Sequence, residues 1–276
     1  MEVAPPPTRP ELPEGVDRRP RWPAWYAGVG FLVALVGTLI AFVILAAAFG
    51  IDSEDDESAA FTTVATFAQN VVFIGTAVLF ASMTMRPRAW HFGLNRTAFW
   101  RAVGWAALGI FAFYFFAGIY SLLLEPEAEQ GVTEALGADE STIGLISAGF
   151  MVVVVAPVAE ELFFRGFFYR ALRSRYTVLG AALIDGLLFG AIHWDFTSEG
   201  LEIVPPLALL GLIFCLVYER TGSLFPVIGL HALNNAVAYG AQTDGSGAWV
   251  SVGFGVVTLV GCAVVPRLLR PAPAAS

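Results

Sequence analysis

The 276-residue sequence is 57% hydrophobic and 14% charged, and its mean hydropathy is +0.70. Because soluble domains are about 45–50% apolar and about 25% charged, this composition excludes an ordinary soluble protein and indicates a polytopic membrane protein. Acidic residues outnumber basic ones by 23 to 15, giving a net charge of −8, and we expect the lipid bilayer, and no nucleic acid, among the partners.

Apolar segments follow one another along the chain, each near the ~20 residues that a spanning helix needs. They lie at about residues 24–49, 58–85, 102–124, 142–168, 178–194, 204–218, 224–240 and 248–265, and the sixth and seventh of them are short. We therefore predict an all-α, polytopic membrane protein with about eight transmembrane helices.

The two ends of the chain differ from this apolar middle. Residues 1–23 are rich in proline and charge, a composition that cannot bury a core, so we predict a disordered cytoplasmic tail there. One transmembrane domain is expected at 24–265, because no polar stretch inside it is long enough for a separate soluble domain. Residues 266–276 are expected to form a cytoplasmic C-terminal tail.

Basic and acidic residues occupy different loops of the predicted membrane domain. All 15 basic residues are arginine, and apart from Arg165 each falls in the N-terminal tail, in the loops after the second, fourth and sixth apolar segments, or at the C-terminus. Acidic runs at 52–57 and 125–140 occupy the alternate loops. The positive-inside rule then predicts that both termini are cytoplasmic. The absence of lysine suggests a GC-rich prokaryotic genome, so we expect an integral protein of the plasma (inner) membrane.

Ionisable residues inside the apolar segments are the sequence's most informative feature. A carboxylate or guanidinium at the centre of a bilayer costs on the order of 2.5–3.5 kcal/mol on insertion scales, so such groups indicate a functional site. The residues concerned are Glu160, Glu161, Arg165, Asp185, His193 and His231.

Glu160 and His193 are expected at one depth in the membrane. The segments that carry them form a hairpin that turns near Tyr176 and Thr177, with Glu160 lying 16 residues before Tyr176 and His193 lying 16 residues after Thr177. At 1.5 Å per residue, both lie up to ~24 Å along their helices from the turn. The sequence thus predicts an acid and an imidazole at the same level.

Glu161 and Arg165 have the i,i+4 spacing of a helical ion pair, whereas Glu160 points about 100° away. We interpret the pair as structural and Glu160 as free for chemistry. The alternative is that all three residues form one mutually satisfied polar cluster.

His231 and Asn235 also share one face of a helix at i,i+4 spacing. Glu160, alone or with His193, could take a proton from water, while His231 and the Asn235 amide could donate hydrogen bonds to the oxyanion formed when water attacks a carbonyl. These residue types therefore predict water-mediated amide hydrolysis within the membrane. In a rival interpretation, Glu160, His193 and His231 hold a catalytic zinc ion, so the cofactor is either none or a divalent metal.

Three motifs in this region resemble those of one family. The stretches EELFFR (160–165), FGAIH (189–193) and HALNN (231–235) match E-E-x-x-x-R, F-x-x-x-H and H-x-x-x-N in order on successive helices. Together they resemble the CPBP family of CAAX proteases and bacteriocin-processing enzymes, also called Abi, over about residues 142–240.

The resemblance implies a role for each matching residue. Glu160 and His193 would activate water, His231 and Asn235 would stabilise the oxyanion, and Glu161, Arg165 and Phe189 would support the site. It also implies an intramembrane catalytic cavity open to the cytoplasm, and metal-dependent as well as metal-free mechanisms are associated with the family. Asp185 shares a face with Phe189 and His193, so we expect it either at the substrate entrance or in a water-filled vestibule.

The sequence therefore predicts an intramembrane endopeptidase that acts on a membrane-anchored protein or peptide. A non-catalytic peptide-binding member of the same family and a transporter or proton relay are the alternatives. The sequence identifies neither the substrate nor the oligomeric state.

Overall fold

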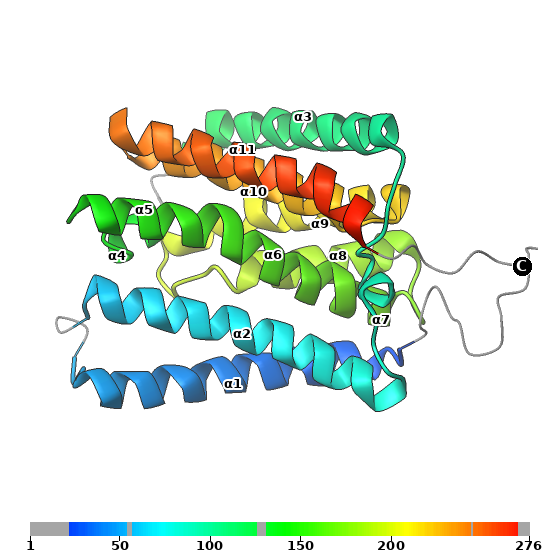
Figure 1. Ribbon diagram of the computed structural model, residues 1–276, viewed down its shortest axis with the longest axis horizontal. Helices are drawn as coiled ribbons and strands as arrows, with labels where there is room; N and C mark the ends of the chain where they lie inside the picture. Colours follow the sequence, from blue (N-terminus) through cyan, green and yellow to red (C-terminus); the bar gives the residue numbers. More distant parts are fainter. Residues whose placement is uncertain (1–21, 54–56, 126–130, 244, 270–276) are drawn as a thin grey trace, which may run out of the picture.

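The computed structural model describes residues 22–53, 57–125, 131–243 and 245–269, and this part of the chain is helical without strands (Figure 1). Most of the two predicted tails, residues 1–21 and 270–276, and parts of both acidic loops lie outside the described residues. The predicted all-α membrane architecture is confirmed.

The long helices follow the predicted segments closely. They are α1 (Trp25–Phe49), α2 (Ala59–Thr84), α3 (Phe99–Leu124), α8 (Val178–Ala191), α9 (Val204–Thr221), α10 (Phe225–Gln242) and α11 (Gly245–Leu268). The short helix α4 (Val132–Ala135) follows α3. Before α8 comes a longer helix that we call the composite helix, because α-helical and π-helical segments alternate along it. Its parts are α5 (Thr142–Phe150), a π-helical segment Met151–Val155, α6 (Ala156–Glu161), a second π-helical segment Leu162–Phe168 and α7 (Tyr169–Leu172).

The predicted count of about eight spans is not confirmed. Six helices in the described part of the chain are long and apolar enough to cross a membrane. The other two predicted segments form α8, which has only 14 residues, and α10, which carries His231, Asn234 and Asn235 on its 18 residues.

Beyond Ala191 the backbone of α8 changes to i→i+3 hydrogen bonds, from His193 to Gly190 and from Trp194 to Ala191, and a local turn follows. Asp195 Oδ1 accepts hydrogen bonds from the backbone N–H of Thr197 at 3.0 Å and from its hydroxyl at 2.7 Å. Such side-chain bonds compete with helix continuation. They lower the pKa of the exposed Asp195 carboxyl, the hydroxyl bond being the largest cause. The turn leads into a 3₁₀ segment, Gly200–Ile203, before α9.

The helices run roughly side by side, with the α1–α2 hairpin at one edge and α3 at the opposite edge (Figure 1). The composite helix and α8 to α10 lie between them and contribute most of the buried side chains. Trp22, expected in the tail, is fully buried and its ring packs 5.4 Å from that of Phe92 and 5.6 Å from that of Phe167. The described core therefore begins before residue 24.

Candidate active site

Glu160 and Glu161 lie at the end of α6, between the two π-helical segments of the composite helix. The wider π turns are rare and occur frequently at functional sites. Glu161 is fully buried and Glu160 is 9% exposed. Two carboxylates are thus held inside the helical bundle.

Glu161 and Arg165 form the predicted ion pair. Arg165 Nη1 donates to Glu161 Oε1 at 2.9 Å, and neither side chain has any exposed area. Removing one partner of such a buried pair leaves an uncompensated charge, which typically lowers stability by about 3–5 kcal/mol.

Arg165 also has partners on the neighbouring helices α8 and α9. Its Nη2 donates to the Gly211 carbonyl oxygen at 3.1 Å, and its Nε lies 3.4 Å from Asp185 Oδ1. The guanidinium carbon lies 4.4 Å from the ring centroid of Phe189 and 5.0 Å from that of Phe214. The cation is therefore enclosed by two carboxylates and aromatic faces, an arrangement that offsets its desolvation.

The expected place of Asp185 at the substrate entrance is wrong. Its side chain is fully buried and faces Arg165 from α8. Helix periodicity correctly placed Asp185 on the face of Phe189 and His193, but it could not show that a cation on another helix meets that face.

Small residues bring α8 and α9 close enough to make this cluster. A Cβ atom on Gly186 would lie 2.5 Å from the Ala208 carbonyl oxygen, and one on Gly190 would lie 2.6 Å from the Val204 carbonyl oxygen. Only glycine permits such an approach of two backbones. The two glycines, four residues apart, thus set the position of the Gly211 carbonyl near Arg165.

His231 enters the cluster from α10. Its Nδ1 is 2.8 Å from Glu161 Oε1, and its Nε2 is 3.8 Å from Glu160 Oε2. A carboxylate oxygen accepts, so Nδ1 carries the hydrogen that points at Glu161. Glu161, interpreted from the sequence as the structural partner of Arg165, therefore also orients the His231 ring.

Phe189 packs against both imidazoles of the candidate site. Its ring centroid lies 5.0 Å from that of His193 and 5.8 Å from that of His231. His193 lies just beyond α8, and its Nδ1 donates to the Phe189 carbonyl oxygen at 2.7 Å. Because a carbonyl only accepts, the neutral His193 ring keeps its lone pair on Nε2. No hydrogen bond or ion pair joins Glu160 to His193 among the residues that the structure describes.

Asn235 has a partner on the composite helix. The Ala156 N–H donates to the Met151 carbonyl in the π register, and the next donor in that register, residue 157, is a proline without an N–H. The Val152 carbonyl consequently accepts from Asn235 Nδ2 at 3.0 Å. One amide hydrogen of Asn235 is used in this bond, and the second remains available to donate to another acceptor. Pro157 was not among the residues predicted from the sequence to belong to the site. The feature that could have indicated it is a proline three residues before Glu160 inside an apolar helix.

The proposed zinc ligands do not fit a metal ion in this arrangement. No group of three His, Cys, Asp or Glu residues that could hold one is found within 22–53, 57–125, 131–243 and 245–269. His231 Nδ1 faces Glu161, and His193 Nδ1 faces the Phe189 carbonyl oxygen, so one nitrogen of each imidazole is already engaged.

Comparison with known proteins covers the same part of the chain. Residues 142–237 match the family model for Rce1-like proteins, described as type II CAAX prenyl endopeptidase Rce1-like. This segment is similar to the Rce1-like family. The matched segment runs from the composite helix into α10 and includes all three motifs, so the predicted resemblance to CAAX proteases is confirmed.

Curated relatives align over part of their length. An Escherichia coli protein named "Uncharacterized 24.3 kDa protein" is 35% identical over 120 residues, which is 42% of this chain and 54% of the relative. The Bacillus subtilis protein named "Putative membrane peptidase YdiL" is 27% identical over 139 residues, 48% of this chain and 52% of the relative. The chain thus spans about half the length of these relatives. No solved structure matches the chain.

Proposed function

We propose that this protein is an intramembrane endopeptidase that hydrolyses a peptide bond of a membrane-associated protein or peptide. The match to the Rce1-like family and the peptidase relative support a peptidase-like function. The observation that carries the proposal is Glu160: its Oε2 is buried 3.8 Å from His231 Nε2 and accepts no hydrogen bond from a described residue.

Glu160 is the proposed base. Its Oε2 takes a proton from water, while His193 Nε2, whose lone pair is kept free by the bond from Nδ1 to the Phe189 carbonyl, accepts a hydrogen bond from the same water. The water oxygen then bonds to the peptide carbonyl carbon, and the carbonyl π electrons move to its oxygen. The product of this step is a tetrahedral oxyanion.

His231 and Asn235 are the proposed oxyanion donors. A protonated His231 ring donates Nδ1–H to Glu161 and Nε2–H to the oxyanion, and Asn235 offers the amide hydrogen that Val152 does not use. When the oxyanion collapses, the carbon–nitrogen bond breaks and the proton held by Glu160 moves to the leaving nitrogen. Glu160 returns to a carboxylate, and the products are an acid and an amine.

Arg165 is proposed to position the ring rather than to touch substrate. Its guanidinium bonds to Glu161 Oε1, and the same oxygen holds His231 in one orientation. Asp185 completes the charge balance around Arg165 from α8. No step of the proposed reaction passes through a metal ion.

Host membranes carrying either the wild-type protein or Glu160→Gln test the proposal. Mass spectrometry maps peptide N- and C-termini in both, and Glu134→Gln, which changes an exposed carboxylate on α4, is the matched control. We expect termini that occur with wild type and with the control and fall by about 10²–10⁴-fold with Glu160→Gln. Termini that persist in Glu160→Gln would refute this mechanism, and a retained phenotype without cleavage would favour the non-catalytic peptide-binding alternative.

A further inference from the structure

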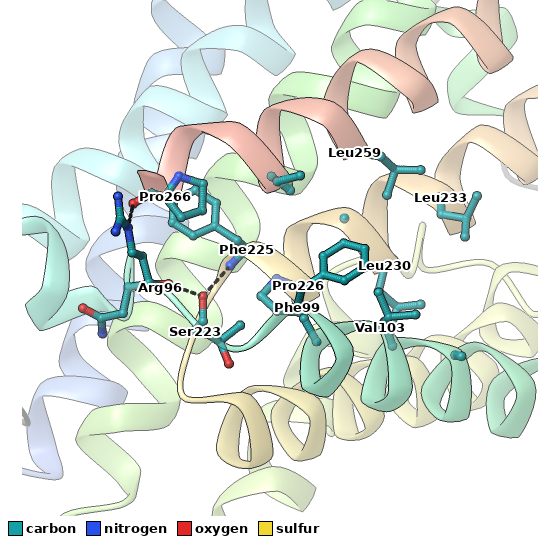
Figure 2. Close-up of a pocket in the computed structure, with 18 of the residues that line it drawn as sticks. Arg96, Phe99, Val103, Ser223, Phe225, Pro226, Leu230, Leu233, Leu259 and Pro266 are labelled. Carbon is teal, nitrogen blue, oxygen red and sulfur yellow. Dashed lines mark hydrogen bonds between the residues drawn. The ribbon is translucent and has the colours of Figure 1, made fainter. Parts of the chain in front are cut away.

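A groove of about 750 Å³ lies between α3, α10 and α11 (Figure 2). On α10 its wall is formed by Pro226, Gly229, Leu230 and Leu233, a set with i,i+3,i+4,i+7 spacing. By helical periodicity this face points away from the one that carries His231. The groove is therefore separate from the candidate active site and shares one helix with it.

The groove has an apolar body that reaches the outer surface of the helical bundle. Small side chains on α3, such as Ala102 and Ala106, leave the space open. Val103, Leu233 and Leu259 line it and are 42%, 37% and 40% exposed. In a membrane, this rim faces the acyl chains of the lipids.

Polar groups gather at one end only. Asn95, Arg96 and Thr97 precede α3, Ser223 precedes α10, and Arg267 is in the last turn of α11. Figure 2 shows Arg96 and Ser223 at this end of the groove, with Leu230, Leu233 and Leu259 away from it. The predicted orientation places this end at the cytoplasmic surface, where anionic lipid headgroups are concentrated.

No carboxylate in the described part of the chain neutralises the charge at this end. Arg96 donates from Nε to the Pro266 carbonyl at 2.8 Å and from Nη2 to the Arg267 carbonyl. These bonds fix its guanidinium against the end of α11 and leave Nη1 available to donate to a ligand. The Arg267 side chain is exposed. No described carboxylate forms an ion pair with either arginine, and the groove lining contains no Asp or Glu.

We propose that this groove binds one anionic phospholipid of the bilayer, with an acyl chain along α3, α10 and α11 and the phosphate beside Arg96 and Arg267. The volume falls in the range of about 300–1,000 Å³ that is typical of small-molecule sites. A phospholipid matches both parts, because an acyl chain requires no hydrogen bonds and a phosphate requires donors. A peptide would leave its backbone polar groups unsatisfied along the apolar body.

Native mass spectrometry of the full-length protein tests this proposal. The detergent-solubilised protein is mixed with phosphatidylglycerol or phosphatidylcholine carrying the same acyl chains. We expect one retained phosphatidylglycerol and a preference over phosphatidylcholine of about fivefold per arginine that contacts the headgroup. Equal retention of the two lipids would overturn the anionic site.

Two variants and their matched controls locate the lipid. Arg267→Gln should lower the preference for phosphatidylglycerol by about fivefold, whereas Arg101→Gln, on the first turn of α3 outside the groove, should not. Val103→Trp should fill the groove and abolish retention, whereas Leu108→Trp, at another exposed position on α3, should not. Unchanged retention in Val103→Trp would place the lipid elsewhere and refute the proposal.

A label on the wild-type protein gives a readout that does not depend on a variant's folding. Phosphatidylglycerol with a photoactivatable diazirine in its acyl chain should label peptides of α3, α10 and α11 that line the groove. Labelling confined to α1, α2 and α8 would refute the site. Displacement of the label by excess phosphatidylglycerol, and not by inorganic phosphate, would assign the site to the lipid rather than to a free anion.

Discussion

Glu161 has two hydrogen-bond partners, whereas the Glu160 side chain has none among the described residues and only approaches His231 Nε2, at 3.8 Å. Glu161 Oε1 accepts from Arg165 and lies 2.8 Å from His231 Nδ1, and Glu160 Oε2 accepts no hydrogen bond from a described residue. The two adjacent carboxylates should therefore respond differently to neutralisation.

Replacing each by glutamine separates the two roles. We expect both Glu160→Gln and Glu161→Gln to abolish cleavage. Only Glu161→Gln should lower stability as well, by about 3–5 kcal/mol, because it leaves Arg165 without its closest counter-ion. Thermal unfolding in detergent, measured beside the cleavage rate, checks this, and an equal loss of stability in both variants would contradict it.

Asp185→Asn distinguishes a buried counter-ion from an entrance residue. Arg165 keeps Glu161 in this variant, so we expect a smaller loss of stability, about 1–3 kcal/mol, and a KM close to that of the wild type. The kinetic constants and the melting temperature measure the two effects. A raised KM with unchanged stability would instead indicate contact with the substrate.

At the scale of the helix, Pro157 connects the shape of the composite helix to the position of Asn235. Pro157→Ala supplies an N–H that can bond to the Val152 carbonyl and so compete with the Asn235 amide. We expect a lower kcat with equal or higher thermal stability. Pro205→Ala is the control, because Pro205 lies in the first turn of α9, where proline removes no helix bond and should leave kcat unchanged. A kcat equal to that of the wild type in Pro157→Ala would contradict this positioning role.

The close contact of α8 with α9 makes a second prediction for the helices. Gly186→Ala would bring a Cβ atom 2.5 Å from the Ala208 carbonyl oxygen and 2.8 Å from the Leu212 nitrogen. Because both neighbours are backbone atoms, the helices must separate, and we expect a loss of about 1–3 kcal/mol of stability. Gly118→Ala on α3 meets nothing within 4 Å and should be neutral or slightly stabilising. Similar melting temperatures for the two variants would count against the close packing.

Across the whole molecule, local periodicity was predictable and long-range partners were not. The helices and the Glu161–Arg165 pair follow from spacing within one helix. The contacts of Glu161 with His231 and of Asp185 with Arg165 join different helices, and no spacing rule reports which faces meet. The length of α8 was overestimated because hydropathy does not report where the backbone changes from helical to i→i+3 bonds, which happens just after Ala191 inside the apolar stretch.

The arrangement of the whole cluster also predicts the response to metal removal. Because no three donors converge in the described part of the chain, we expect cleavage by the purified protein to be unchanged after dialysis against a chelator. Elemental analysis of the same sample should find less than one equivalent of zinc. A stoichiometric metal that is lost in His231→Ala together with activity would refute the metal-free mechanism.

The Phe189 ring packs against both imidazoles and offers neither of them a hydrogen-bond donor or acceptor. A benzene ring has no exchangeable hydrogen and no lone pair, so a chain of hydrogen bonds cannot run through it from His231 to His193. Any proton exchange between the two imidazoles would therefore pass through Glu160, whose Oε2 lies 3.8 Å from His231 Nε2, and through the water that Glu160 and His193 share in the proposed reaction. The same carboxylate would then both generate the nucleophile and link the two rings.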